Sequence, residues 1–373
     1  MEVDYRLFFD NKAAVQKQLD MIDEITIEQE VDMAWEARFQ IPITVDKKGN
    51  WVGDDEDFMR PFCRVRVEIR IKQEPYAALF DGPITGFDSR MSSEPGKSTI
   101  TLIAQDDTFY LNRVEKMAAF ENKPDHEVAE QLFADFGDLI ALTRIDDTPA
   151  PGSALTPLVV QRGTAMQLLR FLARRQGMHA YVLPGENPGE SIGCFNVFPI
   201  QPDGLAPLIL LGAQRNIDSL QVRYCGCKPS DAAASTLRIT DKQVVSETSR
   251  AADVEIMGDE TGEDGSTVDL QILPPRQGES VDLRQAVDAV VQASGYSYEV
   301  TGNILEETYP MALQPYRVVT VRAGNTPISG NYLITKVSHK ITRSGYSQSF
   351  GLKRNARSAR FGSGQTGVPG GIF

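Results

Sequence analysis

The sequence contains few of the residues from which metal sites and nucleophilic centres are built. It has three histidines and four cysteines among 373 residues. The cysteines are scattered apart from one Cys-Gly-Cys pair, and no second CxxC or HxxxH half accompanies that pair. This pattern favours reduced structural cysteines over zinc ligands. The seven residues are His126, His179, His339, Cys63, Cys194, Cys225 and Cys227.

Catalytic signals are also scarce. We expect no GxSxG nucleophile elbow, the zinc-protease motif HExxH and the P-loop are absent, and the three histidines fall in different predicted elements. Pairs of carboxylates can hydrolyse glycosides, but with 51 acidic residues any such pair is unremarkable. The acidic segment 253–269 does not keep the ligand spacing of a calcium loop. We therefore expect no catalytic, cofactor-binding or metal residues, and an enzyme is the weaker hypothesis.

The sequence lacks an excess of basic residues and any long hydrophobic run. Its 38 basic and 51 acidic residues give a net charge of -13, which argues against sequence-independent nucleic-acid binding. No apolar run is long enough to span a bilayer, and the first residues lack the basic and apolar regions of a secretory signal. We expect a globular protein that is made in the cytosol and does not insert into membranes.

Strand patterns fill the first part of the chain. The clearest lies at 62–72, where valine and isoleucine alternate with charged residues. One face of this strand must meet a core; for the other face, solvent is the default and an electropositive binding surface the alternative. Many short strands with turn signals between them predict a barrel or sandwich over about residues 1–112. The charged positions are the candidate interface, namely Arg64, Arg66, Glu68, Arg70 and Lys72.

A helix pattern appears in mid-chain, at residues 163–177. Thr164 can cap its first turn, and Gly177 can take the left-handed conformation that ends a helix. A second helix is predicted at 123–137, and two strands that pair antiparallel at 178–183 and 192–200. We therefore expect a compact α/β module in the middle of the chain.

Strand patterns return after residue 207. They are interrupted by the acidic segment and by a helix predicted at 280–294. Residues 357–373 are rich in glycine and serine and have little to bury, which is typical of a flexible tail. The last two residues, Ile372 and Phe373, are apolar and suited to docking on a partner.

Three stretches resemble the baseplate hub proteins of contractile phage tails and related injection machines, the family of the T4 hub, the late-control D proteins and the N-terminal part of VgrG. Residues 79–86 with 98–107 are similar to the first-barrel hairpin of such hubs, and residues 163–182 to the helix, glycine and strand of their middle domain. Residues 327–350 are similar to the closing hairpin of the second barrel, and this stretch is the most specific.

The resemblance implies an α+β, mainly β fold in which two antiparallel β-barrel domains of the tube type are separated by an inserted α/β module. The implied domains are 1–112 for the first barrel, 113–206 for the module, 207–356 for the second barrel with the helix 280–294, and 357–373 for the tail.

The resemblance also implies a function. A trimer of such hubs presents six similar barrels in a ring, which lets a three-fold spike meet a six-fold tail tube. The implied partners are two further copies, a tail tube protein, other baseplate components and a separate spike protein, since the chain ends about where the second barrel ends. Ile372 and Phe373 are the candidate contact to the spike. Such a protein is made in the bacterial cytoplasm and assembled into the baseplate of a phage tail or injection particle.

Two other function classes stay open. One is a tail-associated cell-wall hydrolase, suggested by the middle module and its acidic neighbours. The other is a carbohydrate-binding β protein, which needs stacking aromatics on one exposed face; the only tryptophans are Trp35 and Trp51, so its support is small.

Overall fold

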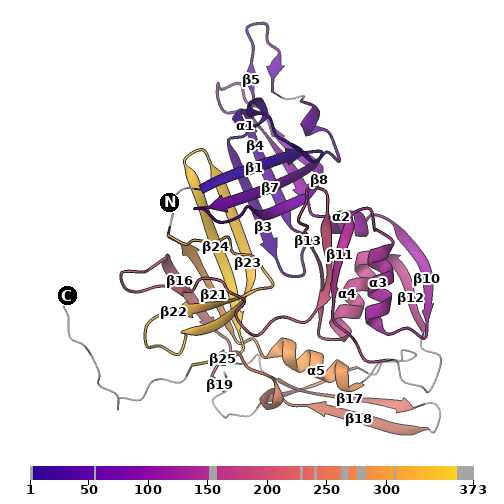
Figure 1. Cartoon of the computed structure of the whole chain (residues 1–373). Coiled ribbons are helices and arrows are strands. Elements are labelled where there is room, and N and C mark those ends of the chain that lie inside the picture. Colours follow the sequence, from indigo (N-terminus) through magenta and orange to yellow (C-terminus); the bar gives the residue numbers. More distant parts are fainter. Residues whose placement is uncertain are drawn as a thin grey trace, which may run out of the picture.

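The computed structural model describes residues 3–53, 56–150, 158–226, 230–238, 242–261, 268–274, 283–305 and 308–358. Strands are far more extensive than helices in this part of the chain, and one sheet alone has 13 strands. The expectation of an α+β, mainly β chain is confirmed. Figure 1 shows N-terminal strands at the top, C-terminal strands at the left and the module at the right. Ile372 and Phe373 lie outside the described residues.

The N-terminal strands alternate apolar and polar residues, and their apolar side chains form the first core. The cleanest predicted strand is β7, which buries Val65, Val67 and Ile69 as expected. The elements of this region are β1 (Val3–Phe9), β2 (Lys12–Ala13), α1 (Gln16–Met21), β3 (Glu24–Glu30), β4 (Glu36–Pro42), β5 (Thr44–Val45), β6 (Trp51–Val52), β7 (Arg64–Ile71), β8 (Ala77–Arg90), β9 (Thr99–Gln105) and α2 (Thr108–Leu111), with a 3-10 turn at Asp57–Met59.

The sequence pattern also predicts a helix at 10–19 that is capped by Asp10 or Asn11, but helix α1 is shorter. Asp10 and Asn11 have positive φ values of 47° and 62° and form the turn from β1 into β2. Two residues in the left-handed region cannot continue into a right-handed helix. The helix therefore begins only at Gln16.

The long strand β8 pairs with two different strands along its length. Its first half pairs with β7 and its second half with β9. Gly82 lies where the strand passes from one to the other, and a Cβ there would lie 2.0 Å from the backbone oxygen of Gln105. Only glycine lets the two backbones approach this closely.

The C-terminal strands form a second core. The strand patterns after residue 207 predict strands at 217–224, 316–322, 330–341 and 346–353, and all four are confirmed, with bounds shifted by a few residues at most. The elements are β15 (Leu208–Ile209), β16 (Ile217–Tyr224), β21 (Tyr298–Ile304), β22 (Val318–Arg322), β23 (Gly330–Thr342), β24 (Gly345–Arg354) and β25 (Ala356–Arg357).

The two strand-rich regions share one sheet, because β3 pairs antiparallel with β23 along its whole length. A buried chain of hydrogen bonds crosses this seam. The Gln29 side chain donates to the Leu79 carbonyl oxygen at 2.7 Å, and its own oxygen lies 3.2 Å from Nε2 of His339. Nδ1 of His339 lies 2.8 Å from the Tyr346 hydroxyl. These contacts fit a neutral histidine that donates to Gln29 and accepts from Tyr346.

The inserted module packs two helices against two small sheets around its own core. Helix α4 begins and ends as predicted: Thr164 and Gln167 form a capping box, and Gly177 has a φ of 67°. Two features were not predicted, namely a ribbon of β10 and β12 and a strand β11 that runs parallel to β14. The elements are β10 (Glu115–Glu121), α3 (Asp125–Ala134), β11 (Ile140–Ile145), β12 (Leu158–Thr164), α4 (Ala165–Arg175), β13 (His179–Pro184) and β14 (Ser191–Asn196).

The helix predicted at 280–294 is α5 (Leu283–Ser294), and it packs on a separate three-stranded sheet. Val287 and Val291 of α5 meet Ala232 and Ala234 of the sheet in a small fourth core. The acidic segment 253–269 lies partly outside the described residues. The elements are β17 (Ser230–Arg238), β18 (Gln243–Ser249), β19 (Glu260–Thr261) and β20 (Asp269–Ile272), with a 3-10 turn at Ala251–Asp253.

The neutral His339 predicts a pH dependence of stability. Burial lowers the pKa of His339 to about 3, below an unfolded value of about 6.5. The unfolded chain therefore gains a proton as the pH falls below about 6.5, and the folded chain does not. We expect His339 to reduce the free energy of unfolding by up to about 1.4 kcal/mol per pH unit in the range between these two pKa values.

Urea denaturation of the wild type and of His339→Gln at several pH values between 7.5 and 4.5 measures this effect. Carboxylates titrate in the same range, so the observable is the difference between the two slopes. The variant should lose less stability per pH unit than the wild type, and parallel slopes would contradict the assignment.

Candidate functional site

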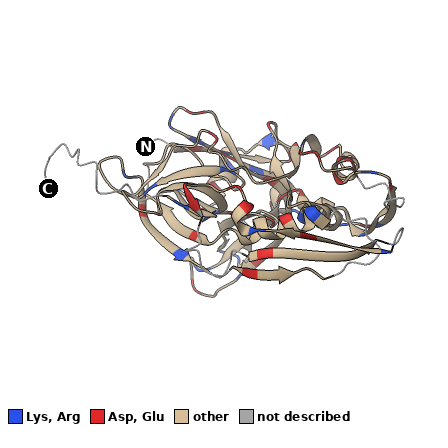
Figure 2. Ribbon diagram, turned by 90° about the horizontal axis from the view of Figure 1, so that it is seen from below, with Lys and Arg blue, Asp and Glu red and all other residues tan. Residues whose placement is uncertain are grey.

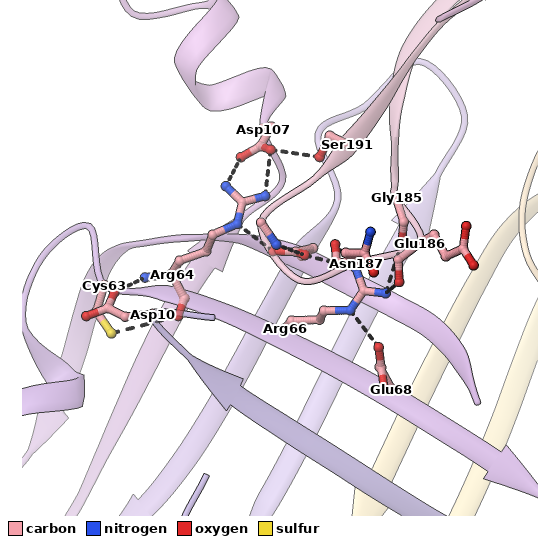
Figure 3. Close-up of polar contacts among 12 residues, drawn as sticks. Asp10, Cys63, Arg64, Arg66, Glu68, Asp107, Gly185, Glu186, Asn187 and Ser191 are labelled. Carbon is pink, nitrogen blue, oxygen red and sulfur yellow. Dashed lines mark hydrogen bonds and ion pairs between the residues drawn. The ribbon is translucent and has the colours of Figure 1, made fainter. Parts of the chain in front are cut away.

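The charged face of β7 is covered by the inserted module. Arg66 is 3% exposed and Glu68 is 8% exposed, and the Arg64 side chain is mostly buried as well. The expectation of a solvated face is wrong for these three residues, because the turn between β13 and β14 lies on them (Figure 3). Charged side chains alternate along β7 because a second, polar layer of the same chain packs there.

Arg64 connects four elements. Its guanidinium donates two hydrogen bonds to Asp107, at 2.9 and 2.7 Å, and one to Asp81 at 2.7 Å. Asp107 also accepts a 2.7 Å hydrogen bond from the hydroxyl of Ser191, at the start of β14. Burial lowers the pKa of Arg64, but its hydrogen bonds and ion pairs with Asp107 and Asp81 outweigh this and raise the pKa above its ordinary value. The paired, planar geometry is the one that arginine forms best with carboxylates.

Arg66 donates hydrogen bonds to the carbonyl oxygens of the turn that joins β13 to β14. It donates to the backbone carbonyl oxygens of residues 185, 186 and 187 at 3.0, 3.0 and 3.1 Å. It also pairs with Glu68 at 2.8 Å and with Asp81 at 3.0 Å, and Asp81 accepts from the backbone N–H of Gly189 at 3.1 Å. We call Arg64, Arg66, Glu68, Asp81 and Asp107 the ionic junction. It fastens the tip of the module's hairpin to β7 and β8.

The end of the same β7 face stays accessible. Arg70 pairs with Asp4 at 2.8 Å, and its side chain is 38% exposed. Lys72 is exposed just after the strand and has a φ of 59°. Of the five charged positions of β7 named from the sequence, these two remain open to a partner.

A stack of aromatic rings joins the module to the C-terminal strands. The rings of Tyr181 and Tyr316 are parallel, with centroids 3.5 Å apart, and those of His179 and Phe198 are stacked at the same distance. The Lys353 ammonium lies 4.2 Å from the centre of the Phe198 ring. We call the four rings the aromatic seam. Such stacks combine a large buried apolar area with a preferred orientation of the rings.

Asp32, in the turn after β3, brings the N-terminal strands to this seam. Its carboxylate lies 2.9 and 3.0 Å from Nδ1 of His179, and its backbone N–H donates to the hydroxyl of Tyr316 at 2.7 Å. Burial raises the pKa of Asp32, but the hydrogen bond and charge of His179 outweigh burial and lower it below its ordinary value. The module is thus held to both strand-rich regions.

The remaining histidine and the two buried cysteines are accounted for by structural contacts and burial. Nδ1 of His126 accepts a hydrogen bond from the backbone of Thr148 at 3.0 Å. Burial raises the pKa of the Cys63 and Cys194 thiols to about 12 each, so both stay protonated at neutral pH. Cys227 lies outside the described residues, within which no cluster of three potential metal ligands occurs.

The segment Gly189-Glu-Ser-Ile-Gly193 has the GxSxG spacing of a hydrolase nucleophile, so the expectation that the sequence holds no such motif is wrong. In hydrolases this serine sits on a sharp turn from a strand into a helix, beside a histidine. Ser191 instead begins strand β14, is 1% exposed and donates to Asp107. The motif therefore contacts the ionic junction through Ser191 and does not form a nucleophile elbow.

A pocket of about 530 Å³ lies beside the aromatic seam. Its charged lining residues are Arg144, Asp146, Asp203 and Arg317. Asp203 accepts a 2.7 Å hydrogen bond from Arg317, and Asp146 accepts one from the backbone of Val197 at 3.0 Å. Both carboxylates are engaged, and the lining includes no hydroxyl of serine or threonine, no thiol and no imidazole.

No protein-family model matches the sequence, and no curated protein matches it either. Solved structures do match. The tail protein from Neisseria meningitidis MC58 is similar over 95% of this chain and 97% of its own, with a TM-score of 0.63 and 13% identity. The 43 kDa tail protein of prophage MuSo2 from Shewanella oneidensis is similar over 95% and 99%, with a TM-score of 0.67 and 13% identity. The chain has the fold of phage tail proteins.

A secretion-system protein also has a similar fold. An E. coli protein, a component of the type VI secretion system with structural similarity to two T4 bacteriophage tail proteins, is similar over 96% of this chain and 80% of its own. Its TM-score is 0.53 and its identity 12%. The resemblance to the baseplate hub family is thereby confirmed at the level of the fold.

Charge and hydropathy add two observations on this tail-protein fold. Figure 2 shows that acidic and basic positions are interspersed along the described part of the ribbon. Within the residues that the structure describes, no helix has the length and hydropathy needed to cross a bilayer.

The contacts of the ionic junction predict that replacing Arg66 strongly lowers the free energy of unfolding. Arg66→Met keeps much of the side-chain volume but leaves Asp81 and Glu68 short of a cation and three carbonyl oxygens short of a donor. We expect the free energy of unfolding to fall by about 3–5 kcal/mol. Arg70→Met, four residues along the same face, should cost less than about 1 kcal/mol because its ion pair is exposed.

Urea denaturation of both variants, with hydrogen exchange read out at β13 and β14, measures the two effects. The Arg66 variant should lose protection first in that hairpin. Equal losses in the two variants would show that the junction does not fasten the module.

Proposed function

We propose that the protein is a structural baseplate hub of a contractile tail or injection machine, a trimeric adapter between a six-fold tail tube and a three-fold spike. The observation that carries this proposal is the tail-protein fold, which extends over 95% of the chain in both phage comparisons. The ionic junction and the aromatic seam also support it, because they hold the module in a fixed position on the strand-rich regions and an adapter needs a rigid structure.

Within this proposal, the two strand-rich regions are two tube-type units. Residues 1–112 form the first unit, 113–206 the inserted module, 207–356 the second unit and 357–373 the tail. The pairing of β3 with β23 supports a fixed arrangement of the two units, because hydrogen bonds along a whole strand hold them in one register. Three copies then present six units around one axis.

The proposed partners are two further copies, the tail tube, a separate spike and other baseplate components. Arg70 and Lys72 are the part of the β7 face that is open to them, whereas the rest of that face is used inside the chain. Ile372 and Phe373 are the proposed spike contact. The protein is made in the bacterial cytoplasm and joins the baseplate of the particle.

The mass of the purified protein, measured alone and after co-expression with its spike, tests the proposal. We expect three copies per complex. A monomer in both preparations would contradict it.

A cell-wall hydrolase is the second candidate, favoured by the pocket that contains Asp146 and Asp203. Zymography on peptidoglycan separates the two functions. The hub should leave no clearing, while clearing that disappears in Asp146→Asn or Asp203→Asn would establish the hydrolase.

The tail provides a narrower prediction. Removing residues 362–373 should leave the thermal unfolding midpoint unchanged, because the segment has little to bury, and should weaken co-purification with the spike at least tenfold. Ile372→Ser with Phe373→Ser is the matched full-length variant and should have the same effect. Undiminished spike binding in both would remove the tail from the mechanism.

A further inference from the structure

The continuous sheet contains the same strand arrangement twice. Its N-terminal strands follow the spatial order β3, β4, β9, β8, and its C-terminal strands follow the order β16, β21, β24, β23. All neighbours in these two sets are antiparallel. The last strand of each set is long and also pairs, through its first half, with one further strand, β7 for β8 and β22 for β23.

A bulge marks the same point in the two long strands. It lies at Thr85 in β8 and at Thr335 in β23. Each threonine follows an isoleucine. Each hydroxyl donates to a carbonyl oxygen of the neighbouring strand, at 3.3 Å to Ile103 of β9 and at 3.1 Å to Gly351 of β24. Because a bulge fixes the local register and twist, the two sets of strands correspond residue by residue, with Thr85 in the place of Thr335.

The two long strands differ in what lies beside them after the bulge. In β23, residues 336–342 pair with β3, and the backbone N–H of Val31 donates to the carbonyl oxygen of Thr335 at 2.9 Å. On the corresponding edge of β8, at residues 86–90, no described strand pairs. At the other end of the same sheet, β16 pairs with β21 alone among the described strands. The two repeated sets thus end in two open edges, one on β8 and one on β16.

Apolar side chains are exposed at both open edges. Phe87 and Met91, in and just after β8, are 62% and 54% exposed, and Tyr224 of β16 is 47% exposed. The corresponding positions in β23 are Val337 and Ile341, which lie beside β3 and are buried. An open edge with apolar side chains is a template for a further strand, and such strand addition obtains its affinity from main-chain hydrogen bonds.

A second copy of this chain fits both edges at once. The strands β16 and β8 are the first and last of eight strands that alternate in direction, so they run opposite to each other. When copies are related by rotation about one axis, β16 of one copy therefore meets β8 of the next in the antiparallel sense, as β3 meets β23 inside the chain. Such a head-to-tail contact uses two different surfaces of each copy and can close into a ring.

The pairing of β3 with β23 also supplies the register. Counting from the two bulges across the neighbouring strands, Asp88 takes the place of Ser338 and Arg223 takes the place of Glu28. Because Glu28 lies opposite Ser338 within the chain, Arg223 of one copy lies opposite Asp88 of the next.

This register brings complementary side chains together. Asp88 and Arg223 are both exposed, and neither has an ion-pair partner within the described part of the chain. One residue along, the exposed ring of Phe87 lies opposite that of Tyr224. Opposite charges and aromatic pairs that face each other directly stabilise antiparallel strands, and a slip by one residue would break both pairs.

We propose that in the trimer β16 of each copy pairs antiparallel with the second half of β8 of the next copy, with Arg223 opposite Asp88 and Tyr224 opposite Phe87. This inference rests on the proposed function, which supplies the three-fold ring. The contact between copies then repeats the contact between β3 and β23 inside each copy, and one sheet passes around the whole ring.

A disulfide in the hub–spike complex tests the register. Directly opposite residues of antiparallel strands have Cα atoms about 4.5–5.5 Å apart, which suits a disulfide. In a background with Cys225→Ser and Cys227→Ser, Asp88→Cys with Arg223→Cys should give covalent dimers and trimers on a non-reducing gel after oxidation. Each single variant should give monomers. The pair Asp88→Cys with Ser219→Cys is displaced by about 13 Å and should also give monomers.

Charge reversal tests the same pairing without a covalent bond. Asp88→Arg and Arg223→Asp should each reduce the trimer population at least tenfold, because each places like charges opposite each other. The double variant restores opposite charges and should restore the trimer. The circular dichroism spectrum should stay unchanged in all three, since both residues are exposed. Arg162→Asp, at an exposed arginine of the module, is the matched control and should leave the trimer intact.

The outcomes separate the inference from the function on which it rests. A trimer that neither forms the Asp88–Arg223 cross-link nor responds to the charge reversals would overturn the edge pairing and leave the hub proposal standing. Cross-linking through Ser219 in place of Arg223 would overturn the register. The absence of a trimer in every preparation, the wild-type complex included, would overturn both the inference and the hub proposal.

Discussion

The structure depends first on the backbone pairing of β3 with β23. These strands are separated by about 300 positions in the chain, yet seven consecutive residue pairs join them antiparallel. Gln29 and His339 are both fully buried at this seam and complete each other's hydrogen bonds. A shift of β3 along β23 would separate Gln29 from His339, and an unpaired buried amide or imidazole costs about 1–3 kcal/mol. This cost holds the two strands in one register. The sheet is therefore continuous from the N-terminal to the C-terminal strands.

The ionic junction and the aromatic seam attach the inserted module to this continuous sheet. Burying Arg64 and Arg66 removes them from water at a cost that ion pairing alone does not always offset. Here each guanidinium finds several partners, and Arg66 serves three carbonyl oxygens of a tight turn. The aromatic seam makes the second attachment of the module, where Asp32 of the N-terminal strands bonds to His179 and Tyr316. The module is therefore anchored at two places, and together these contacts reach both strand-rich regions.

Local patterns in the sequence predicted much of this fold. Alternation located β7, a capping threonine and a C-terminal glycine bounded α4, and the long hairpin of β23 and β24 was visible before any coordinates. Those signals are local in the chain, and the physics that produces them is local too. The turn at Asp10 and Asn11 was missed because non-glycine residues seldom adopt positive φ.

The functional surfaces were harder to predict. The charged face of β7 was taken as solvated, since nothing in its own sequence shows that a turn 120 residues later will cover it. The GxSxG match around Ser191 was passed over, and only the burial of that serine explains why it has no catalytic meaning. Two clues could have pointed to the junction: a strand whose outer positions are all charged, and a glycine-rich turn with carbonyl oxygens to satisfy.

The central claim is that this chain is the adapter at the junction of tube and spike. Electron cryo-microscopy of the native particle tests it most directly. The account predicts density for three copies of the chain in one ring between the last tube ring and the spike. Density for the chain in a fibre, in the sheath or in six copies would contradict it.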